Sequence, residues 1–122
     1  MPRALVIDDD HPVRRMLVEF LGVLGWETDD APDGVEGLAG FDRAKHELIV
    51  TDIRMPGVSG WDVVRAIRGL SPRVPIVIVT GVDVAPPDPA LAAGPEITIL
   101  TKPVSLAQLG EAVAQVTAAA RA

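Results

Sequence analysis

Five short apolar segments, separated by stretches of helical periodicity, constrain the fold more than any other feature of the sequence. Most of them are rich in β-branched residues, as strands buried in a parallel sheet are. Acidic residues in the second segment suit the edge of a sheet. The alternation predicts a parallel sheet with right-handed crossovers and helices on both faces. The segments are residues 4–7, 26–31, 48–50, 75–80 and 97–100.

Capping patterns mark where several of the helices begin. Asp33, Ser59 and Ser105 are each followed three residues later by an acidic residue or a glutamine, which is typical of a helix N-terminus. The helix that follows Asp33 is expected to run through Ala44. The alanine-rich end of the chain, residues 118–122, is expected to fray.

Prolines interrupt the alternation between the fourth and fifth predicted strands. Residues 82–95 contain Pro86, Pro87, Pro89 and Pro95, at the place where a helix is due. Proline is tolerated only in the first turn of a helix. We therefore expect this helix to be short, at residues 89–93, or to be absent.

Polar residues follow four of the strands at the point where each strand ends. Because the carboxyl ends of parallel strands lie along one edge of the sheet, where open α/β sheets bind ligands, these residues should meet there. They are Asp8 and Asp9 after the first strand, Asp52 after the third, Thr80 after the fourth and Lys102 after the fifth.

An acidic cluster at such an edge needs a cation, since two carboxylates about 4 Å apart repel by roughly 4 kcal/mol at an effective dielectric constant near 20. The chain has no cysteine, which excludes thiolate metal sites. Carboxylates in combination with a phosphate group favour Mg²⁺. Lys102 could pair with Asp52 and later with phosphoryl oxygens, and Thr80 could donate its hydroxyl to them. Taken alone, the three consecutive acidic residues Asp8, Asp9 and Asp10 could instead provide a favourable negative charge at a helix N-terminus.

The overall charge argues against direct binding of nucleic acid. The net charge is −6, with 17 acidic against 11 basic residues, whereas nucleic-acid binding needs a basic face. The partner is expected to be a protein or a cation. No apolar run approaches about 18 residues, and no signal-peptide layout is present, so we expect a soluble, cytoplasmic protein without membrane contacts.

These motifs, in this order and spacing, resemble the receiver domain of two-component response regulators from residue 5 to about residue 116. The resemblance implies one receiver domain over residues 1–122. It also implies a flavodoxin-like three-layer sandwich whose five-stranded parallel sheet has the order 2-1-3-4-5. The matching motifs are VIDDD at 6–10, APDGVEGL at 31–38, TDIRMPGVSG at 51–60, IVTG at 78–81 and TKP at 101–103.

The resemblance also implies a reaction. Asp52 would be the phosphoacceptor for a histidine kinase or a histidine phosphotransfer protein, and Thr80 and Lys102 would contact the phosphoryl group. The chain would catalyse its own phosphorylation and dephosphorylation without being a conventional enzyme, and would signal to a downstream protein target. Asp8 and Asp9 would form the metal-binding acid pair.

In that family Mg²⁺ would be contacted by the side chains of Asp9 and Asp52 and by the backbone carbonyl of Arg54. The sequence departs from the family at Ile99, three positions before the lysine, where an aromatic residue is usual; the chain has no tyrosine. Switching is therefore not expected to pass through an aromatic rotamer.

Two alternatives stay open. A pseudo-receiver that only binds proteins would be expected to have lost the acid pair, Asp52 or Lys102, and this chain keeps all of them. A metal-dependent hydrolase with an aspartyl-phosphate intermediate would need room for substrate-recognition insertions, which the chain does not offer.

Overall fold

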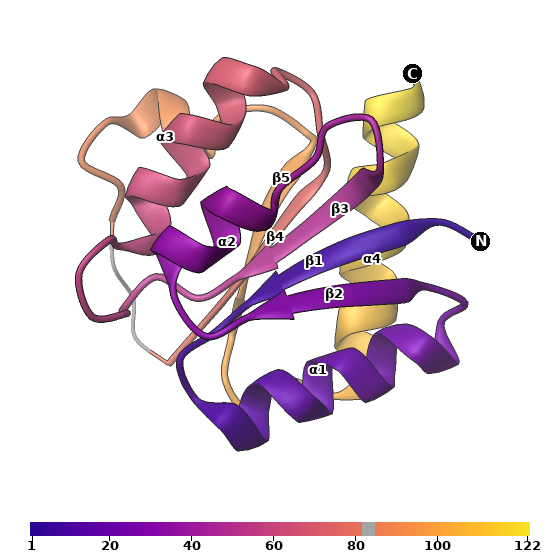
Figure 1. Cartoon of the computed structure of the whole chain (residues 1–122). Helices are drawn as coiled ribbons and strands as arrows, with labels where there is room; N and C mark the ends of the chain where they lie inside the picture. Colours follow the sequence, from indigo (N-terminus) through magenta and orange to yellow (C-terminus); the bar gives the residue numbers. More distant parts are fainter. Residues whose placement is uncertain (82–84) are drawn as a thin grey trace.

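The computed structural model, which describes residues 1–81 and 85–122, contains a five-stranded parallel sheet (Figure 1). Its order is β2-β1-β3-β4-β5, as predicted, and the acidic second strand lies at one edge. The predicted strands agree with the observed ones to within two residues at each end. The strands are β1 (Arg3–Ile7), β2 (Glu27–Ala31), β3 (His46–Thr51), β4 (Ile76–Thr80) and β5 (Ile97–Thr101).

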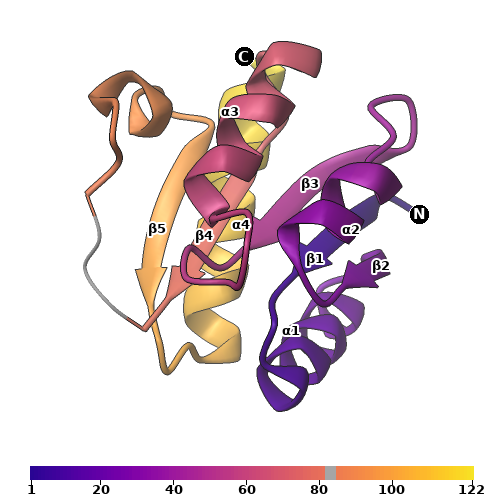
Figure 2. The same ribbon diagram turned by 60° about the vertical axis from the view of Figure 1, so that its left-hand side comes forward.

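The helices form two layers, one on each face of the sheet, so the flavodoxin-like three-layer sandwich is confirmed. Helices α2 and α3 cover one face and α1 and α4 cover the other (Figures 1 and 2). A single turn of 3₁₀ helix, η1, connects β4 to β5 among the described residues. The helical elements are α1 (His11–Val23), α2 (Gly34–Gly40), α3 (Gly60–Leu70), η1 (Pro89–Ala92) and α4 (Leu106–Arg121).

Alternate residues of the central strands supply the two halves of the core. In β4, Val77 and Val79 pack towards α1 and α4, whereas Ile76 and Ile78 pack towards α3. All four side chains are fully buried. Strands covered on both faces need apolar residues at every position, which explains why these segments read as continuous apolar runs.

The predicted caps hold the helix starts in place. Ser59 and Asp62 form a reciprocal capping box at α3, and Ser105 and Gln108 form another at α4. Asp33 caps α2 by accepting a hydrogen bond from the N–H of Glu36. Side chains thus satisfy backbone donors that have no partner within the helix.

Two predicted helix ends are wrong. Helix α2 ends at Gly40 instead of continuing to Ala44, because the carbonyl of Asp42 accepts the N–H groups of Lys45 and His46 in a separate turn. Helix α4 does not fray at residue 118 but continues to Arg121. The guanidinium of Arg73 donates a hydrogen bond of 3.0 Å to the carbonyl of Ala119 and so stabilises this end.

The proline-rich connection forms no regular α-helix in its described part, as predicted. Asp88 caps the η1 turn, with Pro89 in its first position. Residues 82–84 of the predicted segment lie outside the described residues. In the described ranges, none of the helices is both long and apolar enough to cross a membrane.

Candidate functional site

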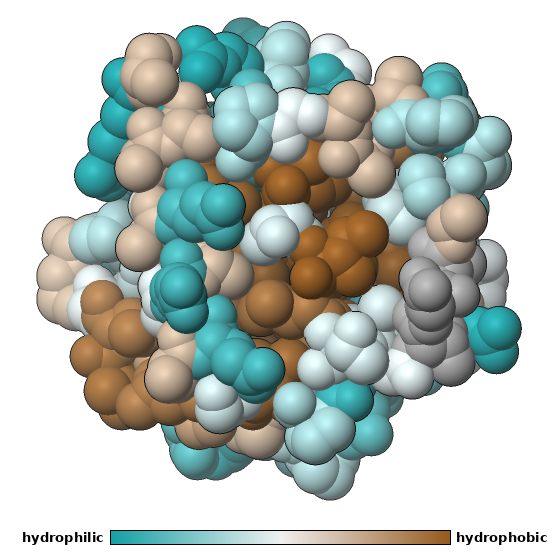
Figure 3. Space-filling view, turned by 180° about the vertical axis from the view of Figure 1, so that it is seen from behind, coloured by the Kyte–Doolittle hydropathy of each residue, from teal (hydrophilic) through white to brown (hydrophobic). Residues whose placement is uncertain are grey.

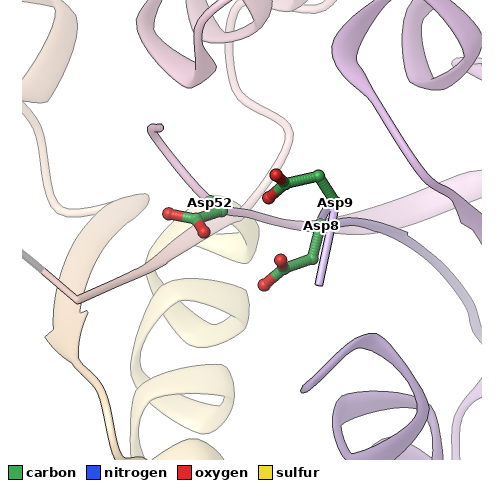
Figure 4. A group of neighbouring side chains, drawn as sticks. All are labelled: Asp8, Asp9 and Asp52. Carbon is green, nitrogen blue, oxygen red and sulfur yellow. The ribbon is translucent and has the colours of Figure 1, made fainter. Parts of the chain in front are cut away.

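Three carboxylates meet at the carboxyl ends of β1 and β3. One oxygen from each of Asp8, Asp9 and Asp52 lies within 4.8 Å of the others (Figure 4). The N–H of Asp52 donates a hydrogen bond of 3.0 Å to the carbonyl of Ile7, which fixes the two strand ends side by side. The predicted acidic cluster is therefore formed.

Lys102 lies directly against two of these carboxylates. Its Nζ is 2.8 Å from Oδ2 of Asp52 and 3.1 Å from Oδ2 of Asp8. Burial alone would lower the pKa of the ammonium, but its hydrogen bonds and charge interactions with Asp52 and Asp8 outweigh burial, so the pKa of Lys102 is raised. Lys102 is thus a fixed cation at the site, which confirms its predicted pairing with Asp52.

Asp8 is the most deeply buried member of the cluster, with no exposed side-chain surface. Its Oδ1 accepts a hydrogen bond from the N–H of Asp10 at 2.9 Å. Its Oδ2 pairs with Nζ of Lys102 at 3.1 Å and has no other polar partner within the part of the chain that the structure describes. Burial raises the pKa of the Asp8 carboxyl, although the Asp10 N–H and Lys102 act in the opposite direction. Among the described residues, Lys102 is thus the group that compensates Oδ2 of Asp8, and the same ammonium also pairs with Asp52.

The two carboxylate oxygens of Asp52 face different partners. Oδ1 accepts a hydrogen bond of 2.6 Å from the N–H of Ile53, and Oδ2 pairs with Lys102. Only 8% of the Asp52 side chain is exposed. Asp9, by contrast, is exposed to solvent. The cluster thus joins a positioned, nearly buried carboxylate to an accessible one.

Thr80 and Arg54 lie near this edge but are less defined by the geometry. Thr80 is the buried last residue of β4, and its carbonyl accepts a hydrogen bond of 2.8 Å from the N–H of Lys102. Arg54 is exposed and follows Asp52 by two residues. The contacts of Thr80 with a phosphoryl group and of the Arg54 carbonyl with a metal stay predictions.

Gly60 shapes the site in a way that the sequence reading missed. A Cβ at this first residue of α3 would collide with the carbonyl oxygen of Asp52 and lie 2.7 Å from the Cα of Ile53. Both obstacles are backbone atoms, so they cannot turn away as a flexible side chain can. The signals in the sequence were the position of Gly60 directly after the Ser59 cap and its place at the end of the matching motif at residues 51–60.

Arg14 is a second residue that the sequence reading missed. Its Nη1 donates a hydrogen bond of 2.8 Å to the carbonyl of Asp8, and its Nε pairs with Asp30 at 2.9 Å. Arg14 therefore links the end of β1 to β2. In the sequence it is an ordinary polar residue of α1, and no pattern distinguishes it.

The cluster suits a small, hard divalent cation. Three carboxylates face a single ammonium, so a further cation would reduce the repulsion that remains between them. All three side chains offer oxygen ligands, which Mg²⁺ prefers. Asp9 is exposed to solvent, so such an ion and its bound water could approach the cluster from that side.

Comparison with known proteins gives a consistent result. Residues 4–114 match the model of the response regulator receiver domain family. The response regulator MprA of Mycobacterium tuberculosis is 36% identical over 108 residues, which are 88% of this chain and 46% of that protein. The sensor histidine kinase RcsC of Salmonella typhi is 32% identical over 111 residues, or 90% of this chain and 12% of that protein. The chain thus spans less than half the length of these relatives.

Solved structures show the same fold. The response regulator TrrA of Thermotoga maritima, in complex with Mg(2+)-BeF, superposes with a TM-score of 0.83 at 32% identity, covering 95% of this chain and 99% of that one. In a second structure TrrA is in complex with the histidine kinase ThkA, and the TM-score is 0.79 at 31% identity, covering 95% and 98% of the two chains.

Proposed function

Because this chain belongs to the response regulator receiver domain family of two-component systems, whose domains occur in histidine kinases and in response regulators, we propose that Asp52 is its phosphoacceptor. The observation that carries the proposal is the position of Asp52. It is a nearly buried carboxylate at a strand end, held by one backbone N–H and one ammonium. Its phosphodonor would be a histidine kinase or a histidine phosphotransfer protein, and TrrA, which is similar to this chain, has been solved with a histidine kinase.

In the proposed reaction a carboxylate oxygen of Asp52 attacks the phosphorus of a phosphohistidine on the partner. The new P–O bond forms as the P–N bond breaks, and the electron pair of that bond returns to the ring nitrogen of the histidine. The product is an aspartyl phosphate, which water later hydrolyses to inorganic phosphate and free Asp52. Carboxylate nucleophiles of this kind are known in other phosphoryl-transfer proteins.

The residues of this chain contribute mainly positioning and charge, which are what phosphoryl transfer requires. The Ile53 N–H and Lys102 hold the attacking carboxylate in one orientation. As Asp52 loses its negative charge to the new bond, Lys102 remains beside it to pair with phosphoryl oxygens. Thr80, at the end of the neighbouring strand, would donate its hydroxyl to the same group.

Asp8, Asp9, Asp52 and the carbonyl of Arg54 would hold Mg²⁺. When bound, the ion would neutralise charge on the carboxylates and on the transferred group. The support lies in the set of three carboxylates, in the exposure of Asp9 and in the Mg(2+)-BeF complex of TrrA.

Phosphorylation would act as a signal because it adds about −1.5 to −2 charge and new acceptor oxygens beside Lys102. A downstream protein would read the resulting change, and the acidic net charge of −6 gives no support for nucleic acid as the target. A cytoplasmic location follows from the proposed donor, since histidine kinases draw their phosphoryl group from ATP.

Incubation with Mg²⁺ and phosphoramidate tests the proposal. We expect one phosphoryl group per chain, seen by intact-mass spectrometry and lost in base. The Asp52→Asn variant should acquire none, whereas Asp62→Asn, which changes an exposed carboxylate in the α3 capping box, should react like the parent chain. Phosphorylation that persists in Asp52→Asn, or that is equally fast without a divalent ion, would overturn the assignment.

A further inference from the structure

The two edges of the sheet differ in how they are protected. Strand β2 forms one edge and β5 the other, and Figure 2 shows β5 at the margin of the sheet. The sequence of β2, ETDDA, carries three carboxylates, whereas that of β5, ITILT, carries no charge. Charged residues on an edge strand discourage pairing with other strands. Only the β5 edge lacks this protection.

The backbone of β5 offers a row of unpaired groups at this edge. The N–H of Ile76 donates to the carbonyl of Glu96, and the N–H of Lys102 donates to the carbonyl of Thr80. Residues 96, 98, 100 and 102 therefore face β4, because the two polar groups of a strand residue point to the same side. The backbone N–H and C=O groups of Ile97, Ile99 and Thr101 point away from β4. They receive no hydrogen bond from residues 1–81 or 85–122.

An apolar side chain lies in the middle of this edge. Ile99 projects to the same face as Ile97, which is buried against α3, yet 45% of Ile99 is exposed. Among the described residues the connection that should cover it is reduced to the η1 turn. Figure 3 shows apolar side chains gathered in a hollow on the face seen from behind. The edge therefore combines unpaired backbone groups with exposed apolar surface.

We propose that this edge pairs with β5 of a second copy of the chain, antiparallel about a two-fold axis at Ile99. In this register Ile99 lies opposite Ile99 of the second copy, and Ile97 lies opposite Thr101. These are the outward-facing residues, so every unpaired N–H and C=O group on both edges gains a partner. A shift of two residues would leave one outward-facing residue of each strand without a partner.

A second copy suits the edge better than an unrelated peptide because the strand is complementary to itself. The opposed side chains are all apolar or β-branched, and such cross-strand pairs are favourable. The chain has a net charge of −6, yet this pairing places no like charges opposite one another within β5. A two-fold contact of this kind is closed, so it ends at a dimer. Because one pair of strands buries little surface, the dimer would be weak and concentration-dependent.

Single cysteines give a direct test of the register, because the chain contains no cysteine. In a hydrogen-bonded antiparallel pair the Cα atoms are about 5.5 Å apart, within the usual range for a disulfide. The Ile99→Cys variant should therefore form disulfide-linked dimers under mild oxidation. In the proposed register residue 98 lies opposite residue 100 of the second copy, so the two cysteines of the Thr98→Cys variant would be offset by two residues along the strands. Their Cα atoms would be more than about 7 Å apart, beyond the usual limit for a disulfide, so cross-linking should be at least about tenfold slower. Equal rates in the two variants, or no cross-linking in either, would overturn the proposal.

Association of the cysteine-free chain gives a second, independent test that does not require phosphorylation. Sedimentation should show a reversible dimer at high concentration, and the amides of Ile97, Ile99 and Thr101 should then exchange more slowly. Ile99→Lys, which opposes two ammonium groups at the axis, should weaken association about tenfold. Val23→Lys, at an apolar residue of α1 that is 71% exposed, should leave association unchanged. A monomer at all concentrations, or a dimer insensitive to Ile99→Lys, would refute the edge pairing.

Discussion

The Lys102→Met substitution tests the electrostatic account of the site most sharply. Lys102 Nζ lies 2.8 Å from Asp52 and 3.1 Å from Asp8, and 20% of its side chain is exposed. Each ion pair amounts to about 5 to 6 kcal/mol at an effective dielectric constant near 20, before desolvation is subtracted. Loss of one partner from a buried pair costs about 3 to 5 kcal/mol. Since Lys102 is not fully buried, we expect the free energy of unfolding to fall by about 3 kcal/mol.

Mg²⁺ should restore part of this loss, because the cation would compensate the same carboxylates that Lys102 compensates. Urea unfolding at low ionic strength, with and without Mg²⁺, measures both effects. The loss should also be smaller at lower pH. Burial already raises the pKa of Asp8, so a proton can replace the missing ammonium there and stabilise the folded state as the pH falls.

The chain offers a matched control, since its only other lysine is Lys45. Lys45 pairs with Asp29 at 3.3 Å, but half of the Lys45 side chain is exposed, and such surface pairs contribute less than about 1 kcal/mol. Lys45→Met should therefore lose little stability and gain nothing extra from Mg²⁺. Equal losses in the two variants, or equal stabilisation of both by Mg²⁺, would refute the reasoning.

Three further substitutions probe the supports of the fold and of the site. Asp29→Asn should cost about 1 kcal/mol at pH 7, because the hydrogen bond from His46 holds the pKa of Asp29 below its usual range. This stabilisation is present above the unfolded-state pKa of Asp29 and is lost as the pH falls through its folded-state pKa. Urea titrations at several pH values would measure the loss. Gly60→Ala should cost about 3 kcal/mol and slow phosphorylation by phosphoramidate, because its Cβ collides with the backbone at Asp52, the proposed phosphoacceptor. Gly69→Ala in the same helix meets no atom within 4 Å, so it should be neutral or slightly stabilising. Ser59→Ala should lower the free energy of unfolding by about 1 kcal/mol through loss of the capping box, measured by the urea midpoint at an unchanged slope.

The parts of the fold that depend on periodicity and on caps were predictable from the sequence. Strand order followed from the resemblance, and the acidic edge strand followed from its composition. The meeting of Asp8, Asp9, Asp52 and Lys102 was predictable because parallel strands end along one edge, so residues far apart in the sequence share a position that topology alone determines.

The errors and omissions share a different cause, since each depends on tertiary contacts that leave no periodic signal. Helix α2 stops at Gly40 because a turn at Asp42 competes for the following backbone groups, and α4 persists to its end because Arg73, far away in the sequence, hydrogen-bonds to it. Gly60 and Arg14 act on the site through backbone carbonyls. A reading based on side-chain chemistry does not detect such contacts.

Strand β5 connects the proposed reaction to the proposed dimer. The presence of Ile99, and not an aromatic residue, determines which part of the strand can carry the connection. Its end supplies Lys102 to the site, and the backbone N–H of Lys102 is bonded to the carbonyl of Thr80. A β-branched side chain in a strand has few accessible χ1 rotamers. Ile99 therefore cannot change rotamer as freely as the aromatic residue that is usual at this position in the family. The direct link between Asp52, the proposed phosphoacceptor, and the outer edge is then Lys102 and the backbone of β5 from Lys102 back to Ile99. A change in the position of Lys102 would alter the same strand on which the two-fold contact depends, which makes the affinity of the dimer the natural quantity to compare before and after phosphorylation.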